Sequence, residues 1–277
     1  MISSNQRTIM FRLSLFIILL APFQLSAQNT IAAVIKNNRK SLYYPQSVAR
    51  FYRQNGYKLA WIAQDTIKTH VWEAMMLLDC VEQYGLIQAD YHPKQLQYDT
   101  LHCLIEQQRP YEEKATYDIM LTDAIIRFMN NLHYGKLNPV YTRLKIDKGS
   151  LFKAEKELLN AINSKDFSTI IDNVQPKSKQ YSNIQNHMHL LVGLRSGDCY
   201  IIPETLIRKM AINMERLRWR NTTGKQVHLT LEVRRGLVIN FKDTYKYDVA
   251  LEEALYNENQ LSKSTLKTIR SLRIPLE

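Results

Sequence analysis

The sequence has little glycine and proline and no long hydrophobic run. Only 8 of its 277 residues are Gly and 8 are Pro, a composition that excludes collagen-like, linker-like and low-complexity proteins. No apolar stretch reaches the roughly 18 residues that a membrane-spanning helix needs, which excludes a polytopic membrane protein. Hydrophobic residues make up 45% of the chain and charged residues 23%, the ordinary composition of a globular protein that buries a core.

Cysteine is also scarce. The chain contains Cys80, Cys103 and Cys199, and an odd number is not the pattern of a disulfide framework. Cys80 and Cys103 fall within apolar helical patterns, so we expect both to be buried as small hydrophobic residues. One disulfide can form after export, and the sequence leaves the pairing open.

The first 27 residues have the pattern of a secretory signal. Arg7 and Arg12 form a basic start, and an apolar stretch over residues 13–21 follows. Ala27 offers a small residue for cleavage, and the apolar stretch is too short to cross about 30 Å of hydrocarbon. The sequence therefore predicts a signal peptide over residues 1–27, a periplasmic location, and no transmembrane span after cleavage.

The chain carries an excess of positive charge. It has 37 Lys and Arg against 26 Asp and Glu, a formal net charge of +11. On an exported protein this excess favours the anionic polymers of the cell envelope as partners, and no motif indicates nucleic-acid binding. Such attraction is long-ranged, unspecific and sensitive to salt. The same excess also fits a protein that is merely kept soluble, and the charge alone does not decide between the two.

Hydrophobic periodicity predicts a mainly α protein. Apolar residues recur at helical spacing over five ranges, and Pro203 opens a sixth helix that continues to Trp219. The five ranges are 66–84, 111–133, 150–162, 166–173 and 180–194. The most loop-like junction between helices is 174–180, which contains Pro176 and two Lys.

After Trp219 the periodicity changes from helical to alternating. The alternation predicts a β-hairpin over residues 227–241, and a closing helix is expected from about Ser264 to Leu272. Near the front of the chain, Tyr57–Ile62 is either a short strand or an extended segment that docks Trp61. The predicted fold is therefore a helical body with a small C-terminal β-hairpin and a closing helix.

Four strings of residues carry a family resemblance. They read FYRQNGYKLAW over residues 51–61, YGL at 84–86 with DYH at 90–92, LHYGKLNP over 132–139, and NMERLRW over 213–219. In that order they resemble the helical scaffold region of large periplasmic L,D-transpeptidases, which cross-link peptidoglycan stem peptides. The resemblance covers roughly residues 45–220. We therefore expect a scaffold domain over residues 28–220 and a remnant-like C-terminal region over 221–277.

The resemblance also implies a catalytic domain that this sequence does not contain. In that family a Ser-His-Gly-Cys-x-Arg motif supplies a thiolate nucleophile, and its His assists as a base. The residues after Trp219 include no Cys, and their single His is His228. The string around Cys199 lacks the His and has Ile201 where the Arg should stand. No catalytic residue is assigned, and the sequence favours a protein without transpeptidase activity.

The histidines do not predict a metal site. His187 and His189 lie two residues apart on an expected helix, so their rings point to different faces and do not share an ion. His92 precedes a proline and is expected to shape a turn. His133 lies at the end of its helix, where a partly charged imidazole interacts favourably with the helix dipole. No metal and no cofactor is expected.

Tyrosines invite a sugar-binding hypothesis. The chain has 16 of them, and Tyr43, Tyr44, Tyr52 and Tyr57 cluster early in the sequence. Aromatic faces stack on glycans, so this cluster is one candidate platform. The alternative is that the rings pack in the helical body and leave their hydroxyl groups at its surface.

Two hypotheses for the function follow. The first is an exported, cell-wall-associated scaffold protein of the L,D-transpeptidase family, non-catalytic, which binds peptidoglycan or a partner enzyme. The second is a subunit or a truncated form of an L,D-transpeptidase whose catalytic domain is supplied elsewhere. A third, unrelated reading is a helical adaptor of the cell envelope. The binding residues, the ligand and the oligomeric state stay open at this stage.

Overall fold

The computed structural model describes residues 30–62, 69–138, 140–196, 204–223, 233–234, 237–238, 251–252 and 255–256. Within these residues the protein is mainly α, as the periodicity predicts. None of the helices in this part of the chain combines the length and the apolar character needed to cross a membrane. The expected signal peptide, Cys199 and the expected closing helix over residues 264–272 lie outside the described residues.

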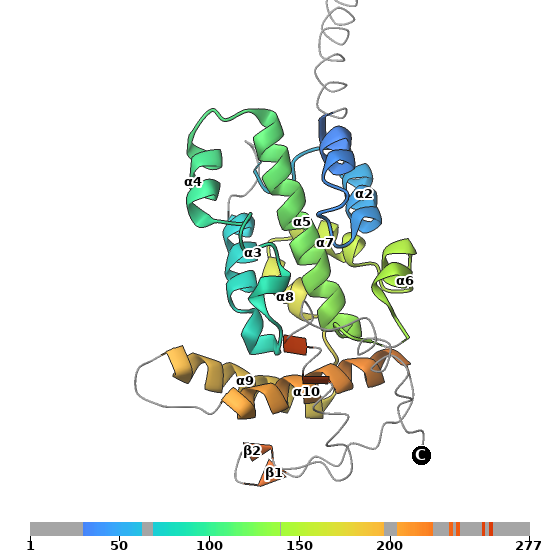
Figure 1. The fold of residues 1–277 in the computed structure, drawn as a ribbon, viewed down its shortest axis with the longest axis vertical. Coiled ribbons are helices and arrows are strands. Elements are labelled where there is room, and N and C mark those ends of the chain that lie inside the picture. Colours follow the sequence, from blue (N-terminus) through green and yellow to red (C-terminus); the bar gives the residue numbers. More distant parts are fainter. Residues whose placement is uncertain are drawn as a thin grey trace, which may run out of the picture.

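The helices follow one another through short connections (Figure 1). Residues 30–37 are helical and come first. The remaining helices are α2 (Pro45–Gln54), α3 (Thr69–Asp79), η1 (Val81–Tyr84), η2 (Gln88–Asp90), α4 (Tyr98–Glu106), α5 (Tyr111–Tyr134), α6 (Arg143–Lys148), α7 (Ala154–Ile162), α8 (Phe167–Asp172), α9 (Lys179–Ser196) and α10 (Glu204–Thr223), of which η1 and η2 are 3₁₀ turns.

The predicted hairpin over residues 227–241 is described at four residues. Strands β1 (Val233–Arg234) and β2 (Leu237–Val238) run antiparallel, with Val233 opposite Val238 and Arg234 opposite Leu237. The other residues of that range lie outside the described part of the chain. The hairpin as a whole therefore stays a prediction.

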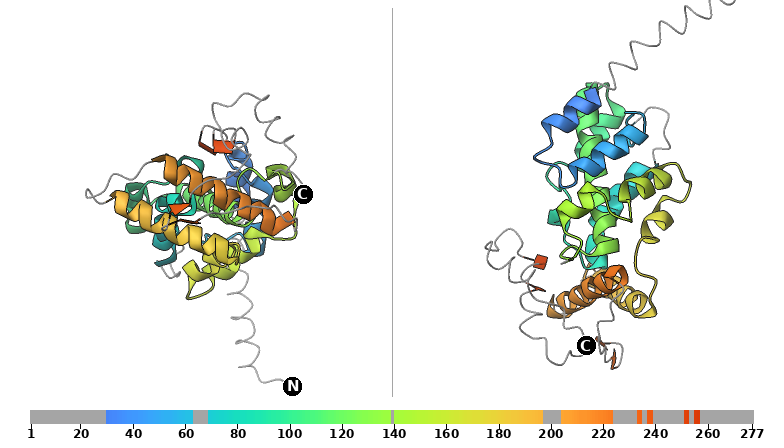
Figure 2. Two further views of the ribbon diagram at one scale, coloured as in Figure 1. Left: turned by 90° about the horizontal axis from the view of Figure 1, so that it is seen from below. Right: turned by 90° about the vertical axis from the view of Figure 1, so that its right-hand side faces the viewer.

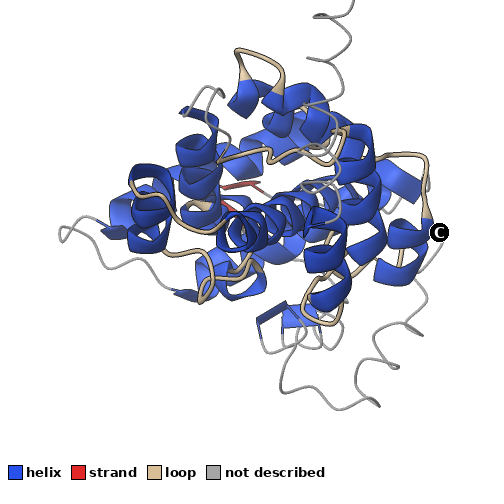
Figure 3. Ribbon diagram, turned by 90° about the horizontal axis from the view of Figure 1, so that it is seen from above, coloured by secondary structure: helices blue, strands red, loops and turns tan. Residues whose placement is uncertain are grey.

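Helix α5 is the centre of the fold. In Figure 1 it runs almost the full height of the helical body, with α3 and α4 on one side and α2, α6 and α7 on the other. Figure 3 looks along this axis and shows the other helices arranged around it. Eighteen of its 24 residues are buried, because neighbouring helices cover it on all sides. A helix enclosed in this way has no solvent face on which to leave its polar residues.

One of the buried polar residues of α5, Asp118, holds the segment before α3. Its carboxylate accepts hydrogen bonds from the backbone N–H groups of Ala60, Trp61 and Ile62, at 2.8 to 3.2 Å, and from the Tyr52 hydroxyl at 2.6 Å. Residues 57–62 form no strand: Tyr57 lies in a turn with φ of +55°, and residues 60–62 bend. The segment docks a buried Trp61, as the second of the two alternatives expects.

Two further buried carboxylates bind the same N-terminal part of the chain. Asp123 of α5 accepts the N–H groups of Tyr43 and Tyr44, at 2.8 and 2.7 Å. Asp147 of α6 accepts the N–H of Ser47 at 2.8 Å and its hydroxyl at 3.0 Å, so it caps the first turn of α2, where no local side chain does so. Together Asp118, Asp123 and Asp147 attach residues 43–62 to the rest of the body, and we call them the carboxylate clamp.

The predicted helix over residues 66–84 is interrupted. Helix α3 ends at Asp79, and the chain continues as the 3₁₀ turn η1 to Tyr84. The break changes which side chains face inward, and the prediction that Cys80 is buried is wrong: it is exposed, whereas Leu78 and Val81 are buried on either side. Cys103 is half-buried for a related reason, because Leu101 and Leu104 take the inward positions of α4. Both thiols are free.

Helices α9 and α10 form a second layer, which crosses the end of α5 (Figure 2). Their apolar faces pack on each other through a separate core of Tyr181, Ile184, Met188, Met210 and Leu217. The close contact between this layer and the body depends on Gly85. A Cβ atom at this position would lie 2.8 Å from the backbone Cα of Ala211 in α10.

Replacing Gly85 by alanine is expected to lower the free energy of unfolding by about 3 kcal/mol. Part of this loss comes from the left-handed backbone, since φ is +65°. Gly56→Ala is the matched control, because Gly56 has φ of +64° but a Cβ atom at this position would have no neighbour within 4 Å. It should cost about 1 kcal/mol. Urea unfolding of both variants measures the difference, and equal losses would show that the contact with α10 does not limit this site.

Candidate functional site

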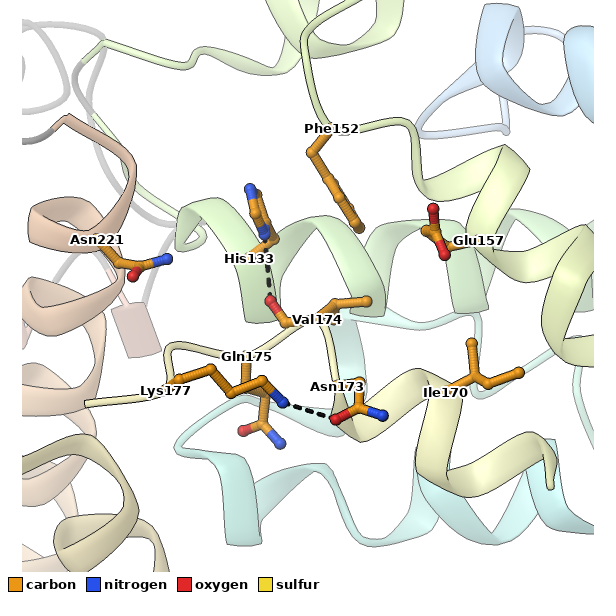
Figure 4. A pocket seen from close by; sticks show the side chains of 9 residues that line it. All are labelled: His133, Phe152, Glu157, Ile170, Asn173, Val174, Gln175, Lys177 and Asn221. Atoms are coloured by element: carbon orange, nitrogen blue, oxygen red, sulfur yellow. Dashed lines mark hydrogen bonds between the residues drawn. The ribbon is translucent and has the colours of Figure 1, made fainter. Parts of the chain in front are cut away.

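The candidate site is a pocket at the junction of the two layers (Figure 4). Its volume is about 390 Å³, within the usual range of about 300–1,000 Å³ for small-ligand sites. Its lining comes from the end of α5 (His133), the loop before α7 (Phe152), α7 (Glu157), α8 (Ile170), the segment after α8 (Asn173, Val174, Gln175 and Lys177) and the end of α10 (Asn221).

One wall of the pocket is aromatic. The rings of His133 and Phe152 stack with their centroids 4.0 Å apart and their planes 16° from parallel. His133 Nδ1 lies 3.1 Å from the carbonyl oxygen of Val174, which only accepts, so this nitrogen carries the proton and donates. Its second ring nitrogen lies on the side of the ring away from Val174 (Figure 4) and forms no hydrogen bond within the described part of the chain.

Burial lowers the pKa of His133, against the raising effect of its hydrogen bond to Val174. The sequence predicts a partly charged imidazole at the helix end, and the structure corrects this: loss of water around the ring outweighs the helix dipole. We expect an NMR titration to give His133 a pKa below 6.5, the ordinary value for histidine. A His133 pKa at or above 6.5 would contradict the neutral ring.

The opposite wall is polar, and hydrogen bonds to neighbouring residues hold it in place. Asn173 Oδ1 accepts a hydrogen bond from Lys177 Nζ at 2.7 Å, which leaves the Asn173 amide nitrogen as a donor. Gln175 is buried, and its amide oxygen accepts from the Tyr181 hydroxyl at 2.9 Å. Its amide nitrogen donates to Asp172. The segment after α8 is therefore fixed before any ligand arrives.

This support extends into α10. The guanidinium of Arg218, completely buried, donates from Nε and Nη2 to the Tyr181 hydroxyl at 3.1 and 2.8 Å. Nη2 also donates to the carbonyl oxygen of Tyr84 at 2.7 Å. A continuous set of hydrogen bonds thus runs from Arg218 through Tyr181 to Gln175 in the pocket wall, and we call it the α10 network.

The segment 143–179, which supplies most of the pocket lining, is rich in cationic side chains. Eight Lys and Arg occur between residues 143 and 179, and all eight are exposed: Arg143, Lys145, Lys148, Lys153, Lys156, Lys165, Lys177 and Lys179. The same segment has five carboxylates, but Asp147 and Glu155 are buried in structural contacts and Glu157 is half-buried. The segment therefore presents a positive surface, because some of its carboxylates are buried in structural contacts and do not balance the exposed cations.

Two rings of the early tyrosine cluster are not available for stacking on a glycan. Tyr44 and Tyr52 are buried, and the hydroxyl of Tyr52 is bound to Asp118 and Thr122. These two rings pack in the body, as in the alternative, but the Tyr52 hydroxyl lies in the interior and not at the surface. Tyr43 lies beneath the guanidinium groups of Arg127 and Arg143, at 3.7 and 4.3 Å from its centroid.

The other singled-out histidines are engaged in local structure. His92 adopts φ of +53° in its turn, and its Nε2 lies 2.7 Å from Asp123 Oδ2, a partner that the sequence did not indicate. His187 bonds through Nδ1 to the carbonyl oxygen of Asn183 one turn earlier. Among the described residues no three His, Cys, Asp or Glu side chains are grouped as metal ligands would be.

Sequence reasoning missed most residues of the pocket. Phe152, Glu157, Asn173 and Asn221 belong to no motif, since they come from four separate parts of the chain. The one available signal was the junction at 174–180, whose Pro and Lys content marked it as a loop.

The comparisons with known proteins give one result. The sequence model of a family described as "Scaffold domain" matches residues 46–188, slightly more than half of the chain. This range contains the carboxylate clamp and every pocket residue except Asn221. No curated protein and no solved structure matches.

Proposed function

This chain belongs to the Scaffold domain family, and we propose that it is a non-catalytic binding protein of the cell wall, related to the scaffold region of L,D-transpeptidases. The proposed ligand is peptidoglycan, met after export to the periplasm. Three of the four strings that carry the resemblance lie within the matched range 46–188, and the fourth, residues 213–219, is almost wholly buried in α10.

The observation that carries this proposal is the positive segment 143–179. All of its cations are exposed, whereas two of its carboxylates are fully used in buried contacts. Stem peptides of the cell wall carry carboxylates, and a surface of this charge raises their local concentration. The charge therefore favours an acidic ligand of this kind.

One of the described cysteines, Cys80, supports the non-catalytic part of the proposal. A nucleophilic cysteine needs a lowered thiol pKa, which a nearby cation or imidazole provides. Cys80 is exposed as a residue, but partial loss of water around its thiol and the neighbouring carboxylate of Asp79 raise its pKa. A thiol in this setting is a poor source of thiolate for acyl transfer.

The proposal is tested by co-sedimentation of residues 28–277 with purified peptidoglycan sacculi over a salt series. The informative variant carries Lys148, Lys153 and Lys156 each replaced by Glu, all exposed positions of the positive segment. A matched control carries Lys36, Lys58 and Lys94 each replaced by Glu, which changes the net charge equally at exposed positions elsewhere. The first variant should bind about tenfold more weakly than the control.

Three outcomes would contradict parts of this proposal. Equal weakening of both triple variants would show that net charge alone attracts the polymer and that segment 143–179 has no special part. Absence of binding even at low salt would exclude peptidoglycan as the ligand and direct the search to a protein partner. Cross-linking activity of the purified chain would overturn the non-catalytic assignment.

A further inference from the structure

The pocket between the two layers has the chemistry of a ligand site rather than of a packing defect. Its volume of about 390 Å³ is accompanied by an ordered lining, in which His133, Gln175 and Lys177 are each fixed by a hydrogen bond. A lining fixed in advance loses little side-chain freedom when a ligand binds. None of the residues that line the pocket belongs to the carboxylate clamp or to the core between α9 and α10.

The charges of the lining select a neutral ligand. Lys177 and Glu157 contribute one charge of each sign, and Lys177 is already bound to Asn173. Partial burial of the His133 ring favours its neutral form, in which it adds no charge. An anion would meet the carboxylate of Glu157, and a cation would meet the ammonium of Lys177.

The uncharged groups of the lining match a sugar ring. His133 and Phe152 lie face to face, so each ring covers one face of the other and a sugar can stack only on an outer face of the pair. An outer aromatic face of this kind suits the C–H face of a pyranose. The amides of Asn173 and Asn221 both donate and accept, as hydroxyl groups also do. The free ring nitrogen of His133 is a further acceptor for a hydroxyl hydrogen.

We propose that this pocket binds a pyranose ring of a glycan strand, with the sugar stacked on the outer face of Phe152, which His133 supports from behind, and its hydroxyls bonded to Asn173 and Asn221. This inference rests on the proposed cell-wall function and adds the part of the polymer that is recognised. The positive segment 143–179 then attracts the carboxylates of the stem peptides, while the pocket binds the sugar ring.

The test is an NMR titration of residues 28–277 with the tetramer of N-acetylglucosamine, in about 0.3 M salt, where the Debye length is only some 6 Å. Phe152→Leu removes the stacking surface, and Asn173→Asp keeps the size and the bond to Lys177 but removes the amide donor. Each should weaken binding about tenfold. Tyr111→Leu is the matched control, because this half-exposed ring lies at the opposite end of α5 from His133.

The outcomes separate this inference from the proposed function. Sugar binding that is weakened by Phe152→Leu and Asn173→Asp but not by Tyr111→Leu supports the pocket, whether or not sacculi sediment the protein. Absence of sugar binding, with salt-sensitive sedimentation intact, overturns the pocket and leaves the proposed function standing. Saturable binding of a short acidic peptide, sensitive to the same two variants, would also overturn the sugar assignment. Asn173 is exposed, so its variant tests the site even if Phe152→Leu destabilises the fold.

Discussion

Replacing Asp118 by alanine is expected to lower the free energy of unfolding by about 4 kcal/mol. The side chain is completely buried, and four donors depend on it: the N–H groups of residues 60–62 and the Tyr52 hydroxyl. Each donor that is left buried without an acceptor costs about 1–3 kcal/mol, and local movement of residues 57–62 recovers part of that sum. Urea unfolding measures the loss.

Two comparisons make this prediction specific. Asp118→Asn keeps the size and one oxygen but turns an acceptor into a donor that faces N–H groups, so it should cost about 2 kcal/mol. Asp99→Ala, at an exposed position in the first turn of α4, should change stability by no more than about 0.5 kcal/mol. A loss below about 1 kcal/mol for Asp118→Ala would contradict the role of this residue in the clamp.

The pH dependence gives a second measurement on the same carboxyl group. Burial raises the pKa of Asp118 from 3.8 to about 6, against the lowering effect of its four hydrogen bonds. Between these two values the native state holds more protons than the unfolded chain. This contribution to stability is therefore fully present below pH 3.8 and is lost as the pH rises through about 6. The stability gap between wild type and Asp118→Asn should be about 1 kcal/mol larger at pH 5 than at pH 7.

The sequence predicts the central helix well and the clamp not at all. The apolar spacing of Leu121, Ile125, Phe128 and Leu132 is local information, and the predicted range 111–133 differs from α5 by one residue. The donors of Asp118 lie 56 to 66 residues away along the chain, so no local pattern contains them. A buried carboxylate in a helix shows in the sequence only as a charge that interrupts an apolar run.

The partners of two charged residues of α5 also lie far away in the sequence. Asp123 and Arg127 are both buried: Asp123 accepts the N–H groups of residues 43 and 44, and Arg127 donates to the carboxylate and the backbone carbonyl of Asp90. The four-residue spacing of Asp123 and Arg127 along the helix does not contain these tertiary partners.

The pocket was missed for a different reason. Its residues are ordinary in type, and what makes them a site is the crossing of α9 and α10 over the end of α5 (Figure 2). Helical periodicity predicts α5, α7, α8, α9 and α10 but not α2 or α6, and it does not give the angle at which two layers meet. Asn221 and His133 are brought to one pocket only by that crossing.

Replacing Arg218 by methionine is expected to lower the free energy of unfolding by about 3–5 kcal/mol. Methionine fills most of the volume but leaves the Tyr84 carbonyl and the Tyr181 hydroxyl without their donor. It also leaves Glu215, whose carboxylate lies 3.7 Å from Arg218, as a buried negative charge without this neighbouring cation. Arg220→Met, two residues further along α10 and half-buried, is the control and should cost less than about 1 kcal/mol.

The α10 network predicts that Arg218 and Tyr181 act together. Tyr181→Phe removes the hydroxyl that accepts from Arg218 and donates to Gln175, so it should cost about 1–2 kcal/mol alone. In the double variant both partners are absent, and the total loss should be about 1 kcal/mol smaller than the sum of the single losses. Strictly additive losses would show that the two residues stabilise the fold independently. Coupling would mean that α10 supports the segment that carries Gln175. The layer of α9 and α10 would then also shape the wall of the pocket beside it.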